Sequence, residues 1–126
     1  MERARRVLIV DDDASIREVA KLSLELVAGW TVRTAGTGSD GVREARATRP
    51  DGILLDVMMP ELDGPATLAE LRADHVVGST PVIFLTAKVQ ASERTRFADL
   101  DVAGLIAKPF DPMTLHEQVA ALFGWA

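Results

Sequence analysis

Short apolar segments alternate along the chain with longer segments in which apolar residues recur at helical spacing. The short segments are wholly apolar and cover residues 7–10, 53–55, 82–85 and 105–107. Each has the length of a strand, whereas the segments between them repeat apolar residues every three or four positions. Strands that alternate with helices predict an α/β domain, in which helices cover both faces of a parallel sheet.

The helical segments carry start and stop signals that predict five helices. The first helix is expected to end at Gly29 and the second before Pro50. The fourth, over residues 92–99, has the weakest pattern. The fifth is predicted to begin with Asp111 as its N-cap and Pro112 in its first turn, because proline fits the first helical position.

One further strand differs from the others in polarity. Residues 31–35 read TVRTA and are half polar, which is typical of an edge strand, whereas wholly apolar strands belong in the centre of a parallel sheet. Right-handed crossovers then favour the strand order 2-1-3-4-5, a flavodoxin-like, doubly wound, five-stranded sheet with five helices. We expect residues 1–126 to form a single domain, because this length leaves no room for a second one.

Composition narrows the classes of function. The chain has 14 Lys and Arg, 19 Asp and Glu, a net charge of −5 and no Cys. Disulfides, thiolate catalysis and Cys-bound metals are therefore excluded, and the acidic balance argues against direct contact with nucleic acid. No apolar segment reaches the roughly 20 residues of a membrane span, so we expect a cytoplasmic protein without membrane attachment.

Residues that carry chemistry gather directly after the predicted strands. Asp11 and Asp12 follow the first strand, Asp56 the third, Thr86 the fourth and Lys108 the fifth. Strands 1 and 3 are neighbours in the predicted order, and ligands of such sheets bind at the carboxyl ends of the strands. We therefore expect the three carboxylates to converge, with Lys108 and Thr86 beside them.

The negative charge of converging carboxylates needs positive charge nearby to offset the repulsion. Two unit charges about 4 Å apart repel by about 4 kcal/mol at an effective dielectric near 20. Lys108 supplies one positive charge, and an all-oxygen site without His or Cys suits Mg²⁺. A carboxylate, Mg²⁺, a lysine and a hydroxyl together fit phosphoryl transfer, in which a carboxylate can be the nucleophile and form an aspartyl phosphate. Asp13, in the same acidic run, is most simply the N-cap of the first helix.

Four motifs follow one another along the chain: VDD at residues 10–12, LDVMMP at 55–60 with Gly64, LTA at 85–87 and AKPF at 107–110. Together, in this order, they resemble the receiver domain of bacterial response regulators. The resemblance covers essentially the whole chain. It implies that Asp56 is the phosphoacceptor, that Asp12 binds Mg²⁺ directly, and that Asp11 holds a metal-bound water.

The resemblance also implies roles around these acids. The main-chain carbonyl of Met58 is expected to be a further Mg²⁺ ligand. Lys108 is expected to pair with Asp56 and then with the phosphoryl group, and the Lys108–Pro109 bond to be cis. Thr86 is expected to hydrogen-bond a phosphoryl oxygen and to move as it does so. Met58 and Lys88 occupy positions that tune phosphoryl lifetime in the family.

The partners follow from the same resemblance. A sensor histidine kinase or a histidine phosphotransfer protein is expected to donate the phosphoryl group. Either a downstream effector protein reads the result, or the chain is part of a longer regulator. The chain is then not an enzyme, but a phosphoacceptor that assists its own phosphorylation and dephosphorylation. The responsive surface is expected to include the fourth helix, fifth strand and fifth helix. One position departs from the family pattern: Leu105 stands where receivers often have the aromatic residue that moves with the threonine.

Other functional interpretations leave some of these site residues unexplained. Gly36, Gly38 and Gly41 fit a dinucleotide-binding G-x-G-x-x-G motif, but they follow an edge strand, and a glycine-rich turn with Ser39 or Asp40 as helix cap is simpler. A haloacid-dehalogenase-like phosphatase would use Asp11 as nucleophile and Asp13 as acid and base. Thr86 and Lys108 would then be its second and third motifs. That class also needs an acidic pair for Mg²⁺ later in the chain, but after Lys108 only Asp111 and Glu117 remain, both in the predicted fifth helix. It also leaves residues 56–60 without a role. A third alternative, a pseudo-receiver that never accepts phosphate, does not need the full acidic set.

Overall fold

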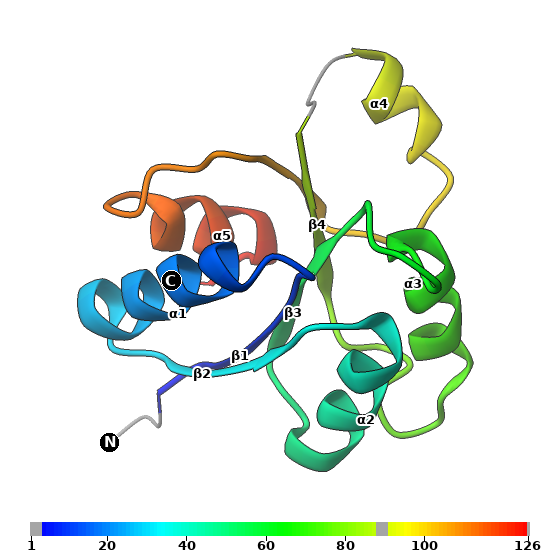
Figure 1. Cartoon of the computed structure of the whole chain (residues 1–126), viewed down its shortest axis with the longest axis horizontal. Helices are drawn as coiled ribbons and strands as arrows, with labels where there is room; N and C mark the ends of the chain where they lie inside the picture. Colours follow the sequence, from blue (N-terminus) through cyan, green and yellow to red (C-terminus); the bar gives the residue numbers. More distant parts are fainter. Residues whose placement is uncertain (1–3, 88–90, 126) are drawn as a thin grey trace.

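The computed structural model describes residues 4–87 and 91–125, and in them strands and helices alternate along the chain (Figure 1). The strands are β1 Arg6–Val10, β2 Thr31–Ala35, β3 Gly52–Asp56, β4 Val82–Thr86 and β5 Gly104–Ala107. The helices are α1 Ala14–Ala28, α2 Gly38–Thr48, α3 Gly64–Ala73, α4 Ala91–Arg96 and α5 Leu115–Phe123.

The strands form one parallel sheet in the order β2-β1-β3-β4-β5, as predicted. Helices α1 and α5 lie together on one face, and α2 and α3 lie on the other (Figure 1). This is the doubly wound, flavodoxin-like fold that the alternation of strands and helices predicted. No helix in the described part of the chain has the length and apolar character that crossing a membrane requires.

The position of β2 at the edge follows from its side chains. Thr31 and Arg33 are exposed, whereas every residue of β3 and β4 is buried. An edge strand contacts a neighbour on one side only, so polar side chains there keep their contact with water.

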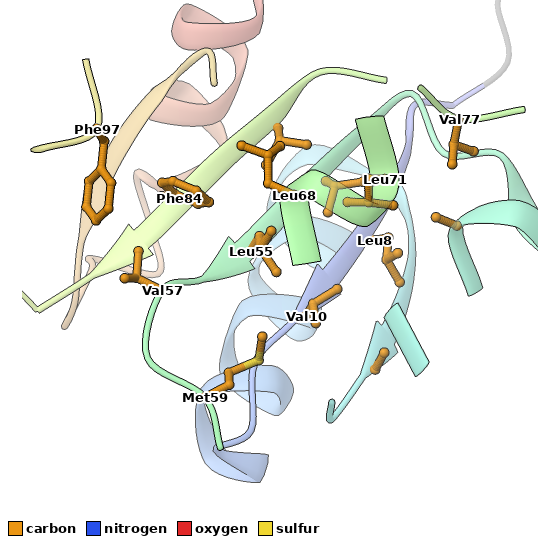
Figure 2. Close-up of a cluster of buried hydrophobic side chains, with 14 residues drawn as sticks. Leu8, Val10, Leu55, Val57, Met59, Leu68, Leu71, Val77, Phe84 and Phe97 are labelled. Carbon is orange, nitrogen blue, oxygen red and sulfur yellow. The ribbon is translucent and has the colours of Figure 1, made fainter. Parts of the chain in front are cut away.

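Two apolar cores lie on the two faces of the sheet. The core under α2 and α3 contains Leu8, Leu55 and Phe84 from the strands and Leu68 and Leu71 from α3 (Figure 2). Phe97, just after α4, joins it through an edge-to-face contact with Phe84, with ring centroids 5.1 Å apart. The second core joins α1 and α5 to the other face. These cores hold the strand ends in fixed register, which positions the site.

The helix ends differ from the sequence predictions at three places. Helix α5 begins at Leu115, because Asp111 caps a turn instead: its carboxylate accepts a hydrogen bond from Met113 N–H and its carbonyl accepts from Leu115 N–H. The cap of α2 is Thr37, not Ser39 or Asp40. Helix α4 ends at Arg96, earlier than the predicted 92–99, and a turn follows it.

The glycines near α2 allow close packing. A Cβ atom on Gly41 would lie 2.8 Å from a Val10 methyl carbon, and one on Gly38 would lie 2.9 Å from the carbonyl oxygen of Leu62. Real Cβ atoms essentially never approach a neighbour so closely, so α2 sits against β1 and the loop before α3 only because these residues lack one. Packing accounts for these two glycines of the G-x-G-x-x-G pattern.

Candidate functional site

Three carboxylates meet at the carboxyl end of the sheet. Asp11 and Asp12 follow β1, Asp56 is the last residue of β3, and one oxygen from each lies within 4.8 Å of the others. Asp11 is 0% and Asp56 2% exposed, whereas Asp12 faces solvent. The convergence expected from neighbouring parallel strands is therefore present.

Lys108 bridges the two buried acids. Its Nζ donates to Asp56 Oδ1 at 2.9 Å and to Asp11 Oδ2 at 3.1 Å. The main-chain N–H of Lys108 donates to the carbonyl of Thr86 at 2.8 Å, which fixes the start of its side chain beside β4. The pairing with Asp56 was predicted, and the second bond to Asp11 was not. The Lys108–Pro109 peptide bond is cis, as predicted.

The electrostatics leave a deficit of positive charge. Burial raises the pKa of the Asp56 carboxyl from 3.8 to about 6, and the negative charge of Asp11 adds to the rise that the Lys108 hydrogen bond opposes. Burial lowers the pKa of Lys108, but its hydrogen bonds to Asp56 and Asp11 and their charges together outweigh burial and raise it. One lysine therefore stays charged but does not fully compensate the acids.

Asp11 is held by its neighbours on several sides. Its main-chain N–H donates to Ala35 O at 3.1 Å, and its Oδ1 accepts from the N–H of Asp13 at 2.9 Å. Asp13 is the N-cap of α1: its Oδ1 accepts from Ser15 N–H at 2.8 Å and from Ile16 N–H at 3.3 Å. The interpretation of Asp13 as a cap is confirmed.

Thr86 and Met58 flank Asp56. Thr86 ends β4, is 7% exposed, and lies in register with Ala107, the residue before Lys108. The N–H of Met58 lies 3.4 Å from Asp56 Oδ1, and its side chain is 80% exposed. The role of the Met58 carbonyl as a ligand stays a prediction, and Lys88 lies outside the described residues.

The residues that were expected to hold Mg²⁺ fit a hard divalent cation. The cluster offers carboxylate oxygens from Asp11, Asp12 and Asp56 close together at a solvent-accessible edge. Oxygen-only ligands are what Mg²⁺ prefers. The pKa of Asp56 is raised mainly by burial and less by the negative charge of Asp11, and a bound cation would oppose both effects.

Sequence reasoning missed one residue of this site. Arg17, on α1, donates from Nη1 to the main-chain carbonyl of Asp11 at 2.7 Å. A helical arginine has no sequence signal of its own, and only its distance of about one helical turn from the acidic run gave a hint.

Comparisons with known proteins agree with the geometry. Residues 7–120 match the family model of the response regulator receiver domain. The chain is 36% identical over 122 residues to the probable transcriptional regulator ycf27 of Guillardia theta, a match covering 97% of this chain and 46% of that protein. It is 33% identical over 118 residues to the alkaline phosphatase synthesis transcriptional regulatory protein PhoP of Bacillus subtilis, with 94% and 48% covered. The chain thus spans about half the length of these curated relatives.

Solved structures of similar size agree over almost their whole length. The chemotaxis response regulator CheY4 of Vibrio cholerae superposes with a TM-score of 0.87 at 30% identity, with 95% of this chain and 99% of that chain covered. A response regulator of Chloroflexus aurantiacus, described as putative, gives a TM-score of 0.86 at 29% identity, with 97% and 99% covered.

Proposed function

The chain belongs to the receiver-domain family of response regulators in two-component signalling, and from that premise we propose that it is a switch that accepts a phosphoryl group on Asp56. The observation that carries the proposal is the pairing of the buried Asp56 carboxylate with Lys108, at 2.9 Å, inside a cluster of acids. In this arrangement the neighbouring acids destabilise the charged carboxylate of Asp56, and Lys108 can stabilise the charge of the phosphoryl group that Asp56 accepts.

The chemistry we propose is attack by a carboxylate oxygen of Asp56 on the phosphorus of a phosphohistidine. Lys108 Nζ and Met58 N–H both donate to Oδ1, so we assign the attack to Oδ2. The new O–P bond forms as the N–P bond breaks, and the electron pair of that bond stays on the imidazole nitrogen. The phosphohistidine belongs to a sensor histidine kinase or a histidine phosphotransfer protein.

Asp11, Asp12, Asp56 and the carbonyl of Met58 are the groups we assign to Mg²⁺. A bound divalent cation would supply positive charge to the phosphoryl oxygens. The chain's own part is to place the acids and to hold Lys108 charged, so that it neutralises the acyl phosphate that forms. The raised pKa of Lys108 keeps it protonated in this role.

The output is a change of conformation rather than turnover of a separate substrate. A cavity of about 110 Å³ is lined by Val57 and Met58, the two residues after Asp56, and by Thr86 and Ala87 from the neighbouring strand end. A hydrogen bond from the Thr86 hydroxyl to the phosphoryl group would bias the domain toward a second conformation, which an effector protein reads over α4, β5 and α5. Leu105 is half-buried and not aromatic, so no ring at that position takes part.

The effector we propose is a protein, because the net charge of −5 opposes contact with nucleic acid. The cytoplasmic location stays a prediction from the sequence.

The test is intact-mass analysis after incubation with Mg²⁺ and acetyl phosphate, a small acyl phosphate donor. We expect one added phosphoryl group in the wild type, none with EDTA, and none in Asp56→Asn. Asp63→Asn is the matched control, because Asp63 caps α3 nearby and asparagine caps a helix equally well. An adduct that survives in Asp56→Asn would contradict the proposal.

The switch has its own test. Thr86→Ala should take up the phosphoryl group but respond less in amide NMR shifts of α4, β5 and α5, whereas Thr86→Ser, which keeps the hydroxyl, should respond as the wild type does. An undiminished response in Thr86→Ala would refute the role given to the hydroxyl.

A further inference from the structure

Arg17 reaches from α1 back to the end of β1. Its main-chain N–H bonds to Asp13 O within the first turn of the helix, and its Nη1 donates to Asp11 O at 2.7 Å. The carboxylate of Asp11 is meanwhile bound by Lys108 Nζ and by Asp13 N–H. Arg17 therefore holds the main-chain side of a residue whose side chain is already fixed.

The carbonyl of Asp11 and the N–H of Asp12 belong to one planar peptide unit. A hydrogen bond that fixes this carbonyl fixes the plane, and with it the N and Cα atoms from which the side chain of Asp12 leaves the backbone. Asp12 is exposed, yet its carboxylate lies within 4.8 Å of those of Asp11 and Asp56. Its position in the cluster thus depends on the backbone more than on side-chain packing.

Gly36 leaves the space that the arginine occupies. It follows β2, which pairs with β1 up to Val10 and Ala35. A Cβ atom on Gly36 would lie 3.1 Å from Arg17 Nη1, which is tighter than ordinary contact, and 3.5 Å from its Cζ. The first glycine of the G-x-G-x-x-G pattern therefore lies directly against the guanidinium group.

We propose that Arg17 is a positioning residue for divalent-cation binding: it orients the Asp11–Asp12 peptide so that Asp12 reaches the cation, and Gly36 provides the space for its guanidinium group. This inference rests on the proposed Mg²⁺ site and adds to it Arg17 from α1 and Gly36 from the loop after β2.

The experiment measures Mn²⁺ affinity directly by electron paramagnetic resonance, with Mg²⁺ competition and without any phosphoryl donor. Partners that orient metal ligands typically change affinity 10–100-fold when removed, so we expect about tenfold weaker binding in Arg17→Ala. Arg17→Lys keeps a charged donor and should recover part of the loss. Arg43→Ala is the matched control: Arg43 lines the same cavity of about 500 Å³ as Arg17 and Gly36, but it pairs with Asp40. Its affinity should equal that of the wild type.

A double-mutant cycle separates positioning from general damage to the fold. Gly36→Ala should weaken Mn²⁺ binding less than Arg17→Ala does, and it should add nothing in the Arg17→Ala background, because its effect passes through the arginine. Thermal unfolding without cation shows whether each variant is folded. If Arg17→Ala does not fold, Arg17→Lys and Gly36→Ala decide the question, because both should still weaken binding.

The outcomes distinguish this inference from the proposed function. Wild-type protein that binds no Mn²⁺ or Mg²⁺ would overturn both. Wild-type protein that binds, with unchanged affinity in folded Arg17→Ala, would overturn only the role of Arg17. Losses from Gly36→Ala and Arg17→Ala that simply add would overturn the link between the two residues.

Discussion

The two ends of the sheet are built from opposite kinds of contact. At the amino end, Trp30 packs edge-to-face on Trp125 with ring centroids 5.2 Å apart, Phe123 lies 4.9 Å from Trp125, and the guanidinium of Arg5 lies 4.7 Å from the Trp125 ring. At the carboxyl end, Asp11 and Asp56 are buried against each other with one lysine between them.

This difference means that the amino end stabilises the fold, whereas the carboxyl end carries the proposed function. Aromatic contacts bury apolar surface and place no uncompensated charge, so they stabilise the fold at any pH. Crowded carboxylates oppose folding until a proton, a cation or a new covalent group changes their charge. The same repulsion makes that end responsive, because any ligand that relieves it shifts the conformational equilibrium.

The largest effect is expected from truncation at the amino end. Phe123→Ala should lower the free energy of unfolding by about 3 kcal/mol, because the ring covers the backbone of Gly52 at the start of β3. Phosphoryl uptake per folded molecule should not change, as measured by urea unfolding and intact mass. Phe123→Leu, which keeps most of the apolar volume, should lose much less. A loss of phosphoryl uptake in folded Phe123→Ala would break the separation of the two ends.

Neutralisation at the carboxyl end should act in the opposite direction. Without cation at pH 7.5, Asp56→Asn should raise the free energy of unfolding by roughly 2 kcal/mol. The folded-state pKa of Asp56, about 6, lies above its ordinary value of 3.8. Its contribution to stability is therefore complete below pH 3.8 and is lost as the pH rises through 6. The groups facing it are Asp11, Asp12 and Lys108.

Urea unfolding from pH 4 to 7.5 checks this sign. The difference in the free energy of unfolding between Asp56→Asn and the wild type should be small at pH 4 and should grow as the pH rises. Asp99→Asn, at an exposed position, should show no such growth. A difference that is the same at every pH would mean that the titration of Asp56 is not its cause.

A bound divalent cation should stabilise the folded protein through the acids at the carboxyl end. At ten times its dissociation constant, Mg²⁺ should stabilise the wild type by about 1.4 kcal/mol, since it binds the folded state. Asp12→Asn should lose most of this gain, measured as the shift of the thermal midpoint on adding Mg²⁺. An equal shift in Asp12→Asn would place the bound cation elsewhere.

The smallest effect is expected at Asp13, which follows Asp12 at the same end of the sheet but caps a helix. Asp13→Ala should lower the free energy of unfolding by about 1 kcal/mol, because it removes the cap of α1, and Mg²⁺ affinity should stay close to that of the wild type. Asp13→Asn should restore the lost stability. A large loss of Mg²⁺ affinity in both variants would make Asp13 a ligand rather than a cap.

Much of this architecture could be predicted because it depends on local patterns. The contrast between apolar residues 7–10 and half-polar residues 31–35 was enough to put β2 at the edge. Parallel strands bring their carboxyl ends to one edge, so the convergence of Asp11 and Asp56 followed from the strand order.

The errors and omissions arose where one local signal fits two structures, or where contacts join distant residues. An Asp–Pro pair can open a helix or a turn, and Asp111 opens a turn. The second bond of Lys108, to Asp11, joins residues 97 positions apart, and the reach of Arg17 to the Asp11 carbonyl depends on a side-chain direction that periodicity does not specify.

Locating the acyl phosphate shows whether Asp56 carries the phosphoryl group. Borohydride reduction of the phosphorylated protein converts the modified aspartate into homoserine, which tandem mass spectrometry of peptides then finds. We expect homoserine at position 56. Homoserine at position 11 would contradict it and would indicate the nucleophile of a phosphatase of the haloacid-dehalogenase type.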